Sequence, residues 1–397
     1  MTDFNWTREQ FHIPLGMIYL DGNSLGALPK MAPDRVLRMM EQEWGQQLIT
    51  GWNASGWMEQ PTRIGNRIAR LIGAQQDHVV LGDTLSIKVF QALASALTLR
   101  PDRRVILSDT GNFPSDLYMA QGLTRLLDRG HELRLVAPEE VEGAITEDVA
   151  VTLITEVDYR TGRRHDMPAL TAKAHEKGAL SIWDLAHSAG AFGVDVAGGG
   201  ADFAVGCTYK YLNGGPGSPA FIYVAPEHAE HAQPALAGWL GHAQPFDFDQ
   251  TYSPGAGIQR MRVGTPPVLQ MTALESALEV WDQVDMDDLR ARSIELSERF
   301  LAGVEQNCPQ LQLFSPRAPE QRGSQVSFQF ENGYAVIQAL ISEGVIGDFR
   351  APDVMRFGFT PLYLNERDVD EAVAILTRVM RGALWDTPKF MTRKTVT

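Results

Sequence analysis

The chain has 397 residues, of which 44% are hydrophobic and 21% are charged, so it is long enough to form a large core and a smaller second unit. Its 35 basic and 49 acidic residues give a formal net charge of -14. This charge disfavours binding to nucleic acid and to anionic membranes, because both carry negative charge themselves. We therefore expect no nucleic-acid partner and no membrane partner.

The two cysteines, Cys207 and Cys308, are too few for a disulfide framework, and neither has the spacing that is typical of zinc ligands. The N-terminal MTDFNWTREQF lacks the basic region and the apolar run of a signal peptide. No apolar segment approaches the length of a bilayer span. We expect a cytoplasmic protein without a bound metal.

Short apolar runs alternate with helical patterns through the first half of the chain. Strands are predicted at 78–83, 104–109, 132–137, 149–158, 178–186 and 202–210, and helices at 86–97, 115–129 and 167–178. Strands separated by helices of this length pair in parallel through right-handed crossovers. The run at 218–225 follows a glycine-rich turn closely enough to be an adjacent antiparallel strand. The pattern predicts an α/β fold with a mainly parallel seven-stranded sheet between helices.

The pattern changes after about residue 266, where long helices are predicted at 266–284 and 289–307. Shorter elements at 325–330, 334–344 and 355–360 predict a small α+β unit. We expect three parts, which are an N-terminal segment packing with the small domain, a large domain, and a small C-terminal domain. Their predicted boundaries are 1–29, 30–265 and 266–397.

Several reactive side chains fall at the predicted carboxyl ends of the strands, where open α/β sheets bind their ligands. These residues are Ser86, Phe113 to Asp116, Asp184, His187 and Lys210. Taken singly, Asp184 or Ser86 is more often a helix cap, His187 a buried core histidine and Lys210 a surface residue. Their common position at one edge of the sheet favours a shared site instead.

Lys210, in TYKYLNGGPGSP, follows an apolar strand where an ammonium ion is costly, so it is either paired or not an ammonium ion. Pyridoxal phosphate accounts for the whole set. It needs a lysine for a Schiff base, an acid such as Asp184 beside its pyridine nitrogen, and an aromatic ring such as Phe113. Helix-end amides at Leu85 and Ser86 suit its phosphate.

At these positions the chain resembles the kynureninases, which are pyridoxal phosphate enzymes of fold type I. The resemblance runs through nearly the whole chain in the family's order. Its motifs are IYLDGNSLG at 18–26, WGQQLITGWNASGW at 44–57, GNFPSD at 111–116, TEVDYRTGRRHDM at 155–167, WDLAHSAGA at 183–191, CTYKYLNGGPGSPAF at 207–221, GWLGH at 238–242, RVGTPPVL at 262–269 and MRFGFTPLY at 355–363. The first and sixth of these motifs together are the most specific.

The resemblance implies that Lys210, Tyr209 and Asp184 are catalytic, with Tyr209 as a proton relay. It implies a cofactor site formed by Leu85, Ser86, Phe113, Pro114, Ser115, Asp116, Asp184, His187, Tyr209, Lys210, Trp239 and Thr265. It implies a substrate site formed by Arg356, Trp52, Gly264, Asn23 and Ser24, in which Arg356 grips the substrate carboxylate. Trp239 and Thr265 are expected to reach the site across a homodimer interface.

The implied reaction is hydrolysis of the Cβ–Cγ bond of L-kynurenine to anthranilate and L-alanine, with 3-hydroxykynurenine as a second substrate. Trp52 and Gly264 match the bacterial pattern that prefers kynurenine, although Trp57 is a rival for the role of Trp52. Asp158 is not assigned, since an acid would repel the phenolic oxygen of the cofactor.

Four other interpretations stay open. A cysteine desulfurase or selenocysteine lyase needs a cysteine on a mobile loop, and neither Cys207 nor Cys308 suits that role. An aminotransferase has the same cofactor requirements. A non-catalytic protein of this fold would be expected to lose Lys210 or Arg356. A metal-dependent hydrolase using Asp184, His187 and His165 lacks close ligand spacing.

Overall fold

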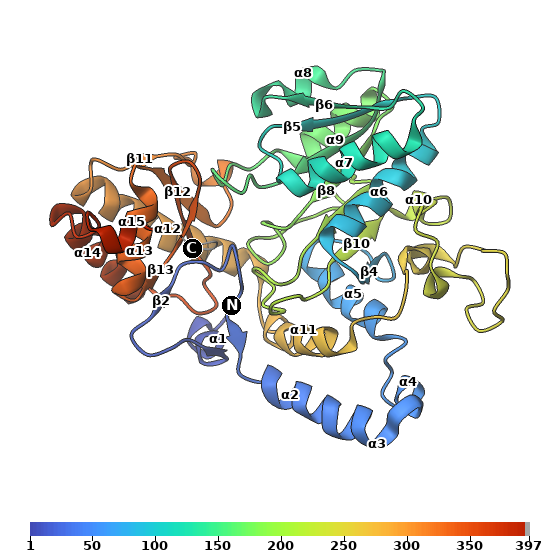
Figure 1. The fold of residues 1–397 in the computed structure, drawn as a ribbon, viewed down its shortest axis with the longest axis horizontal. Coiled ribbons are helices and arrows are strands. Elements are labelled where there is room, and N and C mark those ends of the chain that lie inside the picture. The colour runs from blue at the N-terminus through green and yellow to red at the C-terminus, as the bar shows by residue number, and fades with distance from the viewer. Residues whose placement is uncertain (394–397) are drawn as a thin grey trace.

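The computed structural model describes residues 1–393 and contains a seven-stranded central sheet (Figure 1). In order across the sheet, the strands are β4 (Val79–Leu81), β10 (Phe221–Val224), β9 (Phe203–Gly206), β8 (Leu180–Asp184), β7 (Val149–Thr155), β5 (Val105–Asp109) and β6 (Glu132–Val136). β10 is antiparallel to both of its neighbours, and all other pairs are parallel. This confirms the predicted sheet and the predicted antiparallel strand.

The strands from β4 across the sheet to β5 are buried on both faces and are mostly apolar, whereas the edge strand β6 is partly exposed and carries Glu132 and Arg134. Neighbouring residues of a strand enter opposite cores; Ile182 belongs to one hydrophobic cluster and Trp183 to the other. One face is covered by α6 (Leu85–Leu99) and α7 (Pro114–Leu127). The other is covered by α5 (Gln60–Leu71), α8 (Val141–Ala144), α9 (Met167–Glu176) and α11 (Val268–Trp281).

Most strands are shorter than predicted, and two of them end three or four residues early. β7 ends at Thr155 rather than at residue 158, and β9 ends at Gly206 rather than at residue 210. Beyond Gly206 the backbone leaves the sheet because its carbonyls bond elsewhere: the carbonyl of Thr208 accepts from the following glycine-rich loop, and that of Tyr209 accepts from Gly26. The prediction that Lys210 ends a strand is therefore wrong, and Lys210 lies in the loop four residues later.

The C-terminal part is an antiparallel four-stranded sheet with helices packed on it. Its strands, in order, are β11 (Gln312–Leu313), β12 (Gln325–Gln329), β15 (Val354–Gly358) and β14 (Asp348–Arg350). Its helices are α12 (Met286–Asn307), α13 (Gly333–Ser342), α14 (Glu366–Arg381) and α15 (Pro388–Met391). The ring of Phe300 on α12 packs against Phe328, Phe357 and Phe359 and holds the helix to the sheet. This is the predicted α+β architecture.

The N-terminal segment lies against this C-terminal part (Figure 1). It contains α1 (Phe4–Glu9), β1 (Phe11–His12), β2 (Ile18–Tyr19) and β3 (Leu28–Pro29). β2 pairs in parallel with β13 (Val345–Ile346), and Arg8 forms an ion pair with Asp368 of α14. These contacts join the N-terminal segment to elements of the C-terminal part, and the division into three parts at residues 29 and 265 stays a prediction.

The remaining helices connect these parts. A helical arm along the lower edge of the view in Figure 1 is formed by α2 (Ala32–Arg38), η1 (Met39–Trp44), α3 (Gly45–Gln47), η2 (Leu48–Thr50) and α4 (Gly51–Ala54). Short helices elsewhere are η3 (Pro138–Glu140), α10 (Pro226–Ala229), η4 (Trp239–Gly241), η5 (Gly257–Met261) and η6 (Pro319–Gln321). Within residues 1–393 no helix is long and apolar enough to cross a membrane.

Candidate active site

The loop after β9 places the half-buried side chain of Lys210 beside His187 and Phe113. Nζ of Lys210 is 2.9 Å from Nε2 of His187 and 5.9 Å from the centre of the Phe113 ring. Burial and the charge of Lys210 lower the pKa of His187 well below its usual range. The imidazole is therefore neutral, and its Nε2 can accept a hydrogen bond from the amine.

Asp184 is the last residue of β8, and its side chain is buried. Its Oδ1 accepts a hydrogen bond from the main-chain N–H of Ala186 at 2.9 Å. Burial raises the pKa of this carboxyl, although the charge of Lys210 acts in the opposite direction. A buried carboxylate is favourable only beside a cation, so Asp184 suits the protonated pyridine nitrogen of the cofactor.

Asp116 is a second buried acid at the same place, in the first turn of α7. Among residues 1–393 neither of its carboxyl oxygens has a hydrogen-bond partner. Burial and the nearby charge of Asp184 raise the pKa of Asp116 well above its usual range. Asp116 and Asp184 are both buried, and few charges or hydrogen bonds within the described part of the chain offset a negative charge on them. This arrangement indicates that a cationic group completes the site.

The N-terminus of α6 lies at the same edge of the sheet. β4 and β9 flank β10 in matched register, so their carboxyl ends lie at one level. Thr84, which precedes the helix, makes no capping hydrogen bond with its side chain. The first-turn amides, including those of Leu85 and Ser86, are thus available to an anion, and a phosphate fits there.

Aromatic side chains line the site around Lys210. Phe113 precedes α7, whose first residues are Pro114 and Ser115, and this residue is 41% exposed. The ring of Tyr159 meets the Phe113 ring edge-on, with centres 5.1 Å apart. This contact fixes Phe113 and leaves ring surface open to stack on a planar cofactor.

Tyr209 is the neighbour of Lys210 along the chain. Its ring centre is 5.8 Å from Nζ of Lys210. Burial raises the pKa of the Tyr209 phenol above its usual range, so the hydroxyl keeps its proton at neutral pH. A protonated hydroxyl beside the lysine suits a proton relay.

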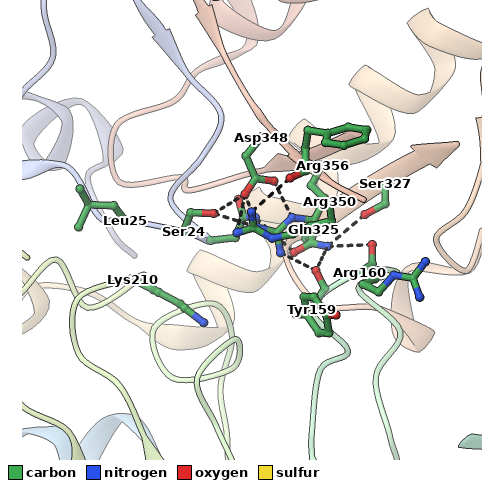
Figure 2. A network of polar contacts seen from close by, with 12 residues as sticks. Ser24, Leu25, Tyr159, Arg160, Lys210, Gln325, Ser327, Asp348, Arg350 and Arg356 are labelled. Carbon is green, nitrogen blue, oxygen red and sulfur yellow. Dashed lines mark hydrogen bonds and ion pairs between the residues drawn. The ribbon is translucent and has the colours of Figure 1, made fainter. Parts of the chain in front are cut away.

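Arg356 is buried on β15 at the centre of a polar network (Figure 2). Its Nε donates to Oδ1 of Asp348 at 2.6 Å, and its Nη2 bonds to Oδ2 of the same carboxylate. Nη1 donates to the main-chain carbonyl of Tyr159 at 2.6 Å, and Nη2 donates to Oγ of Ser24 at 2.9 Å. Figure 2 shows Lys210 close to this network, on the side of Ser24 and Tyr159.

The N-terminal segment connects this network to the lysine loop. Ser24 donates from Oγ to Asp348 at 2.8 Å, and Nδ2 of the buried Asn23 donates to Gln325 at 3.3 Å. Two residues after Ser24, the N–H of Gly26 donates to the carbonyl of Tyr209. A side chain on Gly26 would collide with the carbonyl of Lys210, because a Cβ there would lie 2.2 Å from that oxygen.

Four predicted site residues do not join the others within one chain. Trp52, on α4, packs its ring against Trp57, while Trp239 donates from Nε1 to the carbonyl of Pro245. Gly264 and Thr265 are exposed after η5. Among the residues described, none of the four forms a hydrogen bond or ring contact with Lys210, Asp184 or Arg356.

The sequence analysis missed Tyr159 and two residues beside Arg356. Asp348 and Arg350, both on β14, lie in GDFRAPD just before the Arg356 motif, and Asp348 forms ion pairs with both arginines. The only signal was an acid and a base two residues apart, which places them on one face of a strand. Asp158 has a local role, since its Oδ1 accepts the N–H groups of Arg160 and Thr161.

The metal-dependent hydrolase and the cysteine desulfurase, which are two of the alternative interpretations, need residues that this structure places elsewhere. His165 bonds to Asp109 at 2.8 Å, and residues 1–393 contain no group of three His, Cys, Asp or Glu side chains that could hold a metal. Cys207 is buried just after β9 and Cys308 is buried after α12, so neither thiol is on an exposed loop.

This fold and this site define a pyridoxal phosphate enzyme of fold type I. The structure resembles solved cysteine desulfurases from Thermococcus onnurineus NA1 (TM-score 0.80, 18% identity, 95% of this chain and 98% of that one) and from Escherichia coli (TM-score 0.80, 19% identity, 96% and 99%). At these identities the likeness shows the fold alone.

The sequence is closer to another group of this fold. Residues 289–376 match the family model "Kynureninase C-terminal domain". The chain is 50% identical to the kynureninases of Pseudomonas fluorescens and Burkholderia mallei (strain SAVP1), over 98% of this chain and 95% of theirs. The chain belongs to the kynureninase family, as the sequence motifs predicted.

Proposed function

We propose that this chain hydrolyses the Cβ–Cγ bond of L-kynurenine, giving anthranilate and L-alanine, and that it acts on 3-hydroxykynurenine in the same way, in tryptophan catabolism. The observation that carries this proposal is the 50% identity to kynureninases over nearly the whole chain. The site supports it by placing Lys210 beside His187, with the buried Asp184 within electrostatic reach of Lys210 and the buried Arg356 within electrostatic reach of His187. These groups match an α-amino acid substrate, which brings an amine and a carboxylate.

Pyridoxal phosphate, when bound, supplies the electron sink for the charge that develops on the substrate. Asp184 would keep the ring nitrogen protonated, Phe113 would stack on the ring, and the first-turn amides of α6 would hold the phosphate. Asp116 would add a second negative charge beside the cationic ring.

The residues of the chain would then move the protons. Nζ of Lys210 would take the proton from the α-carbon of the substrate, because this amine lies beside His187 and near the ring of Phe113. His187 is neutral and 2.9 Å away, so it can hold that amine in place. Tyr209 would relay a proton through its hydroxyl. Water adds to the γ-carbonyl carbon, the Cβ–Cγ bond breaks, and the acyl part leaves as anthranilate while the three-carbon part becomes alanine.

Arg356 would bind the substrate carboxylate, together with Ser24 and Asn23 from the N-terminal segment. Gly264 leaves open space where a side chain would otherwise stand, since a Cβ there would meet no atom within 4 Å. With Trp52, this position is proposed to lie by the aryl ring of the substrate and to favour kynurenine over its 3-hydroxy derivative.

We propose that the protein is a homodimer and that Trp52, Trp239, Gly264 and Thr265 complete the site of the partner subunit. The helical arm and the residue before it support this, because six large apolar side chains there are exposed rather than packed. They are Met31, Leu37, Met40, Trp44, Leu48 and Ile49. A cytoplasmic location is proposed because both cysteines are free, which suits a reducing compartment.

The experiment that tests the function incubates the purified protein with pyridoxal phosphate and either kynurenine. The expected result is release of anthranilate or 3-hydroxyanthranilate in equal amount to alanine, with faster turnover of kynurenine. Pyridoxamine phosphate formed in place of anthranilate would instead show an aminotransferase.

A further inference from the structure

Three groups converge on one carboxylate at the edge of the active site. Oδ2 of Asp348 forms an ion pair with Arg356 and lies 2.9 Å from Nη2 of Arg350. It also accepts the hydroxyl of Ser24. Asp348 thus lies between two guanidinium groups, one buried on β15 and one 36% exposed on β14.

Arg356 has little capacity left for a substrate carboxylate. A guanidinium has five N–H donors, and four of those of Arg356 are directed at Asp348 (two), Tyr159 and Ser24. A two-point grip on an incoming carboxylate needs at least two donors. Arg356 alone cannot provide both unless an existing bond breaks, so a second donor group is needed.

The balance of charge points to the same conclusion. Two arginines and one aspartate leave one positive charge in excess, which matches a single carboxylate. Burial acts to lower the pKa of Arg356, but the charge of Asp348 outweighs it and this pKa is raised. Asp348 bonds to Arg356 through both of its oxygens and to Arg350 through one, and burial and the charge of Arg356 lower the pKa of Arg350, so the positive charge of Arg350 is compensated less fully than that of Arg356. Asp21, whose pKa burial and Asp348 raise to about 7, is only partly ionised at neutral pH and offsets this charge incompletely.

The position of Arg350 suits the substrate. Its charge contributes to the lowered pKa of His187, which contacts Lys210, so Arg350 lies within electrostatic reach of the reacting amine. The amine and the carboxylate of an α-amino acid share one carbon atom, and therefore the carboxylate must lie close to Lys210. Figure 2 places Arg350 with Arg356 and Asp348, while the guanidinium of Arg160 points away from them.

We propose that Arg350 is a second carboxylate-binding residue, which acts beside Arg356 on the α-carboxylate of the substrate, and that Asp348 is the positioning residue that holds both arginines. This inference rests on the proposed function, because it names further residues for the same substrate. It assigns the carboxylate to a pair of arginines rather than to one.

The test compares the holoenzymes of Arg350→Gln, Arg350→Lys and the control Arg160→Gln with wild type. The probes are L-kynurenine and kynuramine, which has the same aryl ketone and amine but no carboxylate. Loss of one charged hydrogen-bonding group predicts a rise in KM for kynurenine of about tenfold or more in Arg350→Gln, with a much smaller change in kcat. Inhibition by kynuramine should stay unchanged, Arg350→Lys should recover part of the affinity, and Arg160→Gln should behave as wild type.

An unchanged KM in Arg350→Gln, or an equal loss of kynuramine and kynurenine binding, would overturn the inference. Binding of L-alanine, followed by the absorbance of the cofactor, separates this failure from failure of the function. If wild type forms no anthranilate but Arg350→Gln still weakens alanine binding about tenfold, the proposed reaction is wrong and the role of Arg350 stands.

Discussion

The main-chain carbonyl of Tyr159 accepts a hydrogen bond of 2.6 Å from Nη1 of Arg356, while the ring of the same tyrosine packs edge-on against Phe113. One residue of the loop after β7 therefore contacts both the proposed substrate arginine and the proposed cofactor ring partner. The carbonyl contact survives any side-chain substitution, whereas the ring contact does not.

Replacing Tyr159 with alanine should weaken cofactor binding, because Phe113 loses the ring that fixes it. An aromatic pair contributes about 1 kcal/mol, so the dissociation constant of pyridoxal phosphate should rise about fivefold. Titration of the apoprotein followed by absorbance measures this. Tyr159→Phe keeps the ring and is the control, and a similar loss in both variants would show that the hydroxyl matters instead.

Borohydride reduction of the holoenzyme should attach the cofactor to Lys210 and not to Lys88. Lys88 is also buried, and burial lowers its pKa to about 8, but its amine is bonded to Gln91 and to the carbonyl of Met261. Peptide mass mapping reads out the modified residue, and Lys210→Ala should remove the adduct. Labelling at Lys88 in the wild-type protein would contradict the assignment of Lys210.

Asp116→Asn should stabilise the apoprotein and impair the holoenzyme. The folded protein without cofactor binds a proton at Asp116 more tightly than the unfolded chain does, so stability falls as pH rises above about 4. An asparagine side chain does not ionise and has no such penalty. The thermal midpoint of the Asp116→Asn apoprotein should therefore exceed that of the wild-type apoprotein at pH 8, while the cofactor affinity and kcat of the variant fall. A variant apoprotein less stable than wild type at pH 8 would show that the acid makes a structural contact.

Sequence patterns located those site residues that follow regular elements. Asp184 ends an apolar strand, and Leu85 and Ser86 begin a helix after another, so the rule that ligands bind at the carboxyl ends of strands applies to them directly. Lys210 was placed at the correct edge, but the loop that carries it was read as strand because Cys207 and Tyr209 continue its apolar character.

The arginine cluster was less accessible to such reasoning. Arg350 and Asp348 read as ordinary charged residues of a short strand, and Asp348 is linked to Ser24, which lies more than 300 residues earlier in the chain, by a hydrogen bond. A contact over that separation leaves no periodic signal in the sequence. The same holds for the carbonyl of Tyr159, since a main-chain acceptor is independent of residue type.

Asp21→Asn should remove a pH dependence of stability in the substrate-free protein. Burial and the charge of Asp348 raise the pKa of Asp21 to about 7, above its unfolded value of about 4. The stability that the protonated carboxyl of Asp21 contributes is therefore complete below about pH 4 and is lost as the pH rises to about 7. The free energy of unfolding of Asp21→Asn should exceed that of wild type above pH 7, by an amount on the order of 4 kcal/mol.

Denaturant unfolding at pH 5, 6, 7 and 8 measures this difference. Asp34→Asn is a suitable control, because it removes the same charge from an exposed site near the start of α2. If the free energy of unfolding of Asp21→Asn exceeded that of wild type by the same amount at every pH, the titration of this carboxyl would not be the cause.

Hybrid dimers should regain activity if each site combines residues from two chains. Lys210→Ala removes the proposed catalytic amine, and the double variant Trp239→Ala/Thr265→Ala removes residues proposed to act in the partner's site. In a mixed dimer both defects fall in one site and leave the other intact, so an equal mixture should reach about a quarter of wild-type activity. The activity of each homodimer, measured alone, is the baseline. A mixture no more active than the mean of the two homodimers would place all these residues in the site of their own chain.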